Sequence, residues 1–133
     1  MSVEDQKHHL TAKAALLLST ITMTAIDGEL NENEVAIMNR LDGFNLSEDW
    51  DSAISAWNDL AIDECITLVA QILDVKQQRV AMANMVDIAL ADGSLDETEN
   101  FLLRAYAQAF DVSDADIENI VDVITIKNDK SRF

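Results

Sequence analysis

The chain has 133 residues, 49% of them apolar, so it is long enough to bury the core of one domain and too apolar for an intrinsically disordered polymer. Nine lysine and arginine residues stand against twenty-five aspartate and glutamate residues, a formal net charge of −16. This balance argues against nucleic acid and anionic membrane surfaces as partners, since both are bound through basic patches. It favours inorganic cations and basic proteins.

The N-terminal segment shows no sign of export. Met1-Ser2-Val3-Glu4-Asp5 lacks the basic segment and apolar run of a secretory signal peptide. The longest uncharged stretch with strong hydrophobes, residues 14–26, includes four hydroxyl side chains and is shorter than the roughly 20 apolar residues that span a membrane. We therefore expect a cytoplasmic protein with no direct membrane insertion.

An all-α fold is expected for the whole chain. It has no proline and only three glycines, so the residues that usually interrupt β structure are rare. Apolar periodicity and capping signals predict about seven helices, in chain order near 10–26, 32–42, 50–57, 62–73, 80–91, 97–110 and 117–124. The first and fifth are apolar on almost every side, which is typical of helices in the middle of a bundle.

Several helix starts are indicated by capping side chains. Asn31 and Glu34, and likewise Asp96 and Glu99, have the three-residue spacing of a capping box, in which each residue bonds the backbone amide of the other. Ser47 can cap the next helix in the same way.

The sequence also repeats itself. Residues 27–34, Asp-Gly-Glu-Leu-Asn-Glu-Asn-Glu, align with residues 92–99, Asp-Gly-Ser-Leu-Asp-Glu-Thr-Glu, and both copies follow an apolar helix. With a slip of one residue, Phe44-Asn45-Leu46-Ser47 aligns with Phe110-Asp111-Val112-Ser113. We expect two related halves, approximately 10–60 and 76–126, packed about a pseudo-twofold axis in one domain over residues 1–133.

The repeated motif looks like the second half of an EF-hand loop, but the first half is missing. The first and third loop positions would be Ile88 and Leu90 in one copy and Met23 and Ala25 in the other. Apolar side chains give no oxygen to a hard cation, so an EF-hand is excluded.

A different cation site remains open at the Asp-Gly turns. An aspartate at a helix C-terminus, as expected for Asp27 and Asp92, opposes the helix dipole by a few tenths of a kcal/mol. Either an amide of the next helix or a bound cation would compensate. Asp92, Asp96 and Glu99 could supply oxygens for Ca²⁺ or Mg²⁺, which fit such ligands better than Zn²⁺ or copper. The alternative is that the motif only ends and caps helices.

The run from Ala89 to Glu99, followed by an apolar helix and Phe110-Asp111-Val112-Ser113, resembles the TerB-like superfamily. That group includes tellurite-resistance proteins and the N-terminal domain of a membrane-anchored DnaJ-like co-chaperone. The resemblance covers nearly the whole chain. It implies an all-helical domain of two related halves, a bacterial response to tellurite and other chemical stress, and partners that include membrane proteins of the same system.

The same resemblance implies that acidic clusters bind divalent cations. Matched by position, the ligands are Asp92, Asp96 and Glu99 in the second copy and Asp27 and Glu34 in the first. The first copy has Asn31 where the second has Asp96, so its capacity for a cation is weaker. No His-Pro-Asp signature of a J-domain follows, which excludes the full co-chaperone architecture.

No catalytic constellation is found in the sequence. Cys65 follows Asp63 and Glu64, whose charges raise the pKa of its thiol, so we expect a buried apolar residue and no nucleophile. We predict a non-enzymatic binding or adaptor protein. The alternatives are a metal-free acidic interaction scaffold and an enzyme with an acidic cleft between the halves; a homodimer is left open.

Overall fold

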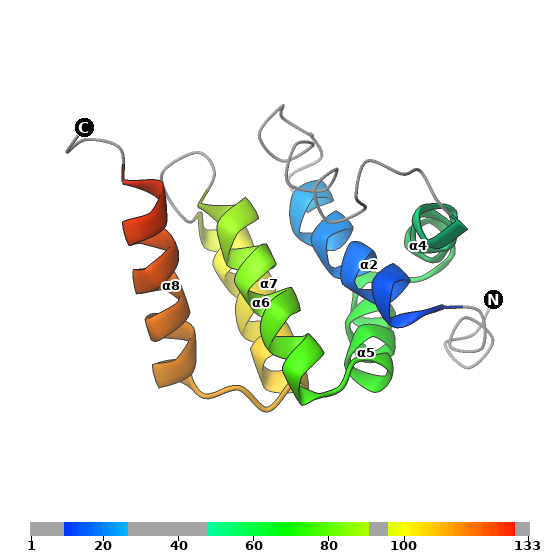
Figure 1. The fold of residues 1–133 in the computed structure, drawn as a ribbon. Coiled ribbons are helices and arrows are strands. Elements are labelled where there is room, and N and C mark those ends of the chain that lie inside the picture. Colours follow the sequence, from blue (N-terminus) through cyan, green and yellow to red (C-terminus); the bar gives the residue numbers. More distant parts are fainter. Residues whose placement is uncertain (1–9, 27–47, 91–95, 130–133) are drawn as a thin grey trace.

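The computed structural model describes residues 10–26, 48–90 and 96–129. These residues form six helices and no strand: α2 (Ala12–Ala25), α4 (Glu48–Asp59), α5 (Ile62–Ile72), α6 (Val75–Ala89), α7 (Glu97–Ala109) and α8 (Asp114–Asn128) (Figure 1). The all-α fold is thereby confirmed. The predicted helix at 32–42 lies outside the described residues.

Capping side chains set the N-terminal ends of four helices. Thr11, Asp74, Asp96 and Ser113 each accept a hydrogen bond from the backbone amide three residues further on. At Asp74 this moves the start of α6 to Val75, ahead of the predicted position 80. The polar first turn of α6 has no apolar periodicity, so only the cap indicates that it is helical.

α2 is the central helix of the described structure. It packs against α4, α5, α6 and α7, and ten of its fourteen residues are buried. Its hydroxyl side chains are buried too, yet each donates a hydrogen bond of 2.6–2.8 Å to a carbonyl three or four residues earlier: Ser19, Thr20, Thr22 and Thr24. These bonds explain how a helix with four hydroxyl groups can occupy the core.

α6 is the helix that precedes the second Asp-Gly pair, and it packs against α2, α7 and α8. From Ala81 to Leu90 every residue is buried or half-buried, as expected for a helix inside the bundle. The first turns of the helix are more exposed and include Val75 and Val80. Gln78 joins it to α5 by donating from Nε2 to the carbonyls of Ala70 and Leu73, both at 3.1 Å, which satisfies acceptors at the end of α5.

The end of α7 explains one of the sequence repeats. Asp111 has a positive φ of 57°, and its amide donates to the carbonyl of Gln108, while the amide of Val112 donates to that of Ala107. This is a Schellman motif, and aspartate tolerates the left-handed conformation better than most residues. Ser113 then caps α8. The Phe-Asp-Val-Ser run therefore ends one helix and begins the next.

Figure 1 shows α2 and α6 running side by side in the same direction, so that both end on the same side of the molecule, where α7 begins and α8 ends. The chain thus enters both Asp-Gly segments from one side of the bundle. The pseudo-twofold relation itself stays a prediction, because residues 27–47 lie outside the described part. Among the described helices, none combines the length and apolar character needed to cross a membrane.

Candidate functional site

The structure describes two of the five predicted cation ligands. Asp96 is the N-cap of α7 and Glu99 lies in the first turn of that helix. Asp27, Glu34 and Asp92 lie outside the described residues. α6 ends at Ala89, with Leu90 as its C-cap, so the helix stops before the Asp-Gly pair at 92–93 and not at the glycine itself.

Asp96 and Glu99 form the predicted capping box. Asp96 Oδ1 accepts a hydrogen bond of 2.7 Å from the Glu99 amide, and Glu99 Oε1 accepts a longer one of 3.5 Å from the Asp96 amide. Both carboxylates lie at the positive end of the α7 dipole, which stabilises their charge.

Glu99 is distinguished by burial. It is 8% exposed, and it is the one charged residue that is buried within the described part of the chain. A carboxylate that leaves water must be compensated by hydrogen bonds or by an opposite charge. The capping box of α6 differs, because a neutral glutamine occupies its third position. There Asp74 and Gln77 exchange hydrogen bonds of 2.8 and 2.9 Å at an exposed site. A charged third residue is therefore not needed for this cap.

The described residues alone do not complete a cation site. Within 10–26, 48–90 and 96–129, no three histidine, cysteine, aspartate or glutamate side chains come together as metal ligands would. The donor chemistry of Asp96 and Glu99 does suit a hard cation. Carboxylate oxygens are the ligands that Ca²⁺ and Mg²⁺ prefer.

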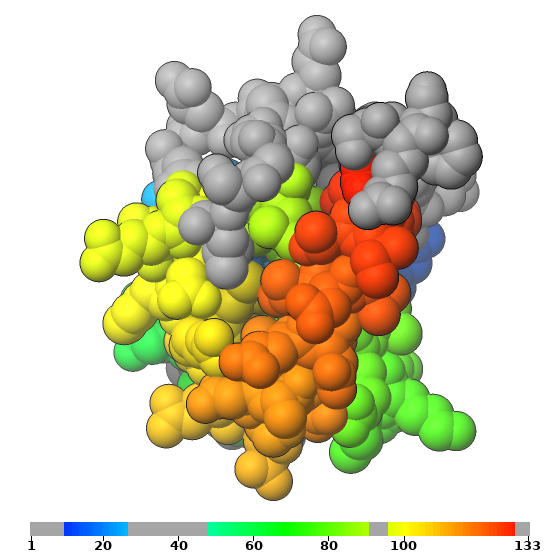
Figure 2. All heavy atoms as spheres, turned by 90° about the vertical axis from the view of Figure 1, so that its left-hand side faces the viewer, coloured from blue at the N-terminus to red at the C-terminus, as the bar shows by residue number. Residues whose placement is uncertain are grey.

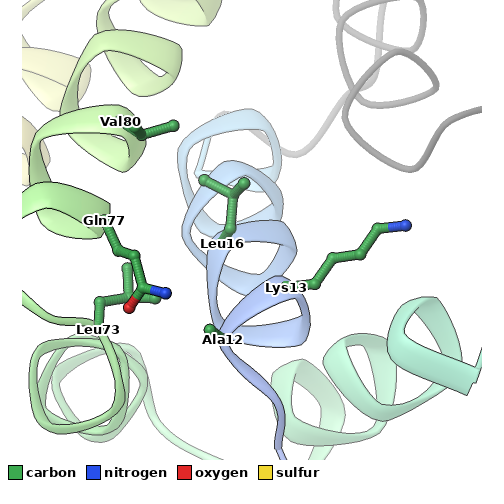
Figure 3. A pocket seen from close by; sticks show the side chains of 6 residues that line it. All are labelled: Ala12, Lys13, Leu16, Leu73, Gln77 and Val80. Carbon is green, nitrogen blue, oxygen red and sulfur yellow. The ribbon is translucent and has the colours of Figure 1, made fainter.

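The surface of the described helices also has grooves that were not predicted from the sequence. One lies where α2 passes the junction of α5 and α6, has a volume of about 220 Å³ and is lined by Ala12, Lys13, Leu16, Leu73, Gln77 and Val80. Figure 3 shows that Lys13 points away from α6, which leaves the groove mainly apolar. Its lining offers no acid and base together for catalysis. Another groove, between α7 and α8, is considered below.

In the described part of the chain the core also surrounds two other titratable groups, and burial favours the neutral form of each. Cys65 is fully buried, and burial, followed by the charges of Glu64 and Asp63, raises the pKa of its thiol to about 11. Burial also raises the pKa of the Tyr106 phenol. At neutral pH the thiol is therefore protonated, which confirms Cys65 as a buried apolar residue and opposes a role as nucleophile.

Comparison with known proteins agrees with the all-helical structure. The family model for the tellurite resistance protein TerB matches residues 13–122. No curated protein and no solved structure gives a significant match. Since the matched segment spans most of the chain and includes α2 to the middle of α8, the chain belongs to the TerB family.

Proposed function

We propose that this TerB-family chain is a non-enzymatic binding protein of the cytosol that serves a tellurite or general stress response by docking protein partners. Membrane proteins of the same response are among the partners we propose. A divalent cation, Ca²⁺ or Mg²⁺, binds at the Asp-Gly turns and adjusts the docking. The observation that supports this most is the burial of Glu99 in the first turn of α7, directly after the second Asp-Gly segment.

The residues that would hold the cation are Asp92, Asp96 and Glu99, with Asp27 and Glu34 at the weaker first turn. The cation would neutralise clustered carboxylates and so stabilise the turn between α6 and α7. The carbonyl end of α6 carries partial negative charge that also favours a cation on this side of the bundle.

Calorimetric titration with CaCl₂ and with MgCl₂ at physiological ionic strength tests the cation. Glu99→Gln gives α7 the same residue pair, Asp and Gln, that already caps α6, so the cap is kept and one charge is removed. We expect the variant to bind the metal roughly tenfold or more weakly, since it loses either a metal ligand or a carboxylate that holds a ligand in place.

Glu64→Gln is the matched control. Glu64 occupies the same third position in α5, where its Oε1 accepts a 3.0 Å bond from the Ala61 amide, and it does not follow an Asp-Gly turn. Its removal should leave metal binding unchanged. No heat at millimolar metal with the unmodified protein, or equal losses in both variants, would reject the cation.

A metal-free acidic scaffold is the second candidate, and the exposed capping box of α6 favours it by showing that the motif geometry forms without a second carboxylate. Partner capture in the presence and absence of chelator separates the two. The scaffold keeps the same partners under chelator, whereas cation-dependent docking loses them.

A further inference from the structure

A groove of about 250 Å³ runs between α7 and α8. Its floor is apolar: Leu103 and Ile117 are almost fully buried and Val121 is half-buried. Its rims are polar, with Asn100 and Arg104 on α7 and Glu118 and Asp122 on α8. Figure 2 views this side of the molecule, with α7 in yellow beside α8 in orange.

The rims carry uncompensated negative charge. The one cation in the lining, Arg104, is already paired, because its Nη1 lies 2.8 Å from Asp114 Oδ1. Glu118 and Asp122 are both exposed, and neither has a hydrogen bond or ion pair within the described part of the chain. They lie one turn apart on the same helix, where like charges repel, so a cation placed between them would be favoured.

Exposed apolar side chains also lie beyond the rims on both helices. Phe101 is 77% exposed and precedes Arg104 by one helical turn, and Ile126 is 74% exposed and follows Asp122 by one turn. α8 has few buried residues of its own: among its aliphatic side chains only Ile117 is fully covered. An apolar surface with acidic rims is complementary to an amphipathic segment that carries basic residues.

We propose that the α7–α8 groove is a docking site for a basic amphipathic segment of a protein partner. Apolar side chains of the partner contact Leu103, Ile117 and Val121, and its lysine or arginine heads pair with Glu118 and Asp122. The long alkyl stems of those basic side chains cover the apolar floor while the heads reach the rim. This inference names a docking surface for the binding function proposed above and rests on that function, but not on the cation.

Fluorescence anisotropy with a labelled helical peptide of leucine and lysine, and with its leucine–glutamate counterpart, tests the proposal in the presence of chelator. We expect the lysine peptide to bind and the glutamate peptide to bind about tenfold or more weakly. Glu118→Gln with Asp122→Asn should weaken the lysine peptide by about tenfold, since each lost pair contributes a factor of a few.

Glu48→Gln with Asp51→Asn is the control, because it removes the same charge from the exposed surface of α4. It should change the affinity by less than about twofold. Amide resonances that shift on titration should belong to α7 and α8. Circular dichroism checks that both double variants remain folded.

Three outcomes would overturn the proposal. Equal weakening by the two double variants would mean that only net charge attracts the peptide, and resonance shifts confined to other helices would place binding elsewhere. If the protein alone is a dimer that Phe101→Ser and Ile126→Ser dissociate, the groove belongs to a second copy of the chain. Failure here leaves the calorimetric test of the cation and the chelator test of docking unaffected.

Discussion

The hydrogen bond between Thr22 and Tyr106 allows a sharp test of the core. The two hydroxyl oxygens lie 2.7 Å apart, and both side chains are fully buried. Thr22 also donates its one hydrogen to the carbonyl of Ser19 at 2.8 Å, so Tyr106 must be the donor in the pair. This assignment predicts unequal effects when each partner is removed.

Tyr106→Phe removes the donor and keeps the ring, whose centroid is 5.6 Å from that of Phe110. Thr22 still donates to Ser19, so we expect a loss of about 1 kcal/mol, the net value of one hydrogen bond. Thr22→Val leaves the buried Tyr106 hydroxyl without an acceptor and should cost more, about 2 kcal/mol within a range of 1–3. The double variant buries no orphaned group and should cost no more than about 1 kcal/mol.

Urea unfolding followed by circular dichroism measures all three free energies, provided that the slope of each transition is unchanged. The double-mutant cycle should deviate from additivity by at least about 1 kcal/mol. If Thr22→Val proves milder than Tyr106→Phe, the donor assignment is wrong. If the two effects simply add, the hydroxyl groups do not interact as the structure describes.

Two further predictions concern α5. Ala61 is the N-cap of α5 and has extended backbone angles, but its side chain cannot accept a hydrogen bond. Ala61→Ser should therefore stabilise the protein by about 0.5–2 kcal/mol in urea unfolding. No gain would mean that the backbone amides of the first turn already have hydrogen-bond partners. The raised pKa of Cys65 means that its thiol ionises in the unfolded chain near the ordinary value of 9.0 and in the folded protein only near 11, so stability should fall by about 1 kcal/mol between pH 8 and 10. The Cys65→Ala variant should not show this part of the stability loss at alkaline pH. If its stability changes with pH just as that of the unmodified protein does, the thiol does not cause the loss.

Local features of the structure could be predicted well. Apolar periodicity and capping signals together located five of the described helices to within a few residues, and the capping box of Asp96 and Glu99 formed at its predicted position. The start of α6 was wrong by five residues, from 80 to Val75, since its polar first turn is indicated only by the cap at Asp74. The EF-hand could be excluded without coordinates, because the side chains at its first positions have no oxygen to donate.

The candidate site could likewise be predicted only in part. The sequence identified the acidic residues around the second Asp-Gly turn, but not that Glu99 is buried while Gln77, in the equivalent position of α6, is exposed. Burial depends on which helices pack over a residue. The α7–α8 groove was missed for the same reason, because Arg104 and Asp122 carry no pattern that places their helices side by side.

Helix positions, caps and the acidic character of this protein follow from the sequence alone, because they depend on residues one to four positions apart and on composition. The partner of Tyr106 does not: Thr22 is 84 positions away, and no local rule selects it among the four hydroxyl residues of α2. Only the packing of α2 against α7 brings the two oxygens together. The same holds for which residues of α6 and α8 are buried and which are exposed, because this is decided by the neighbours that each helix meets in the folded chain.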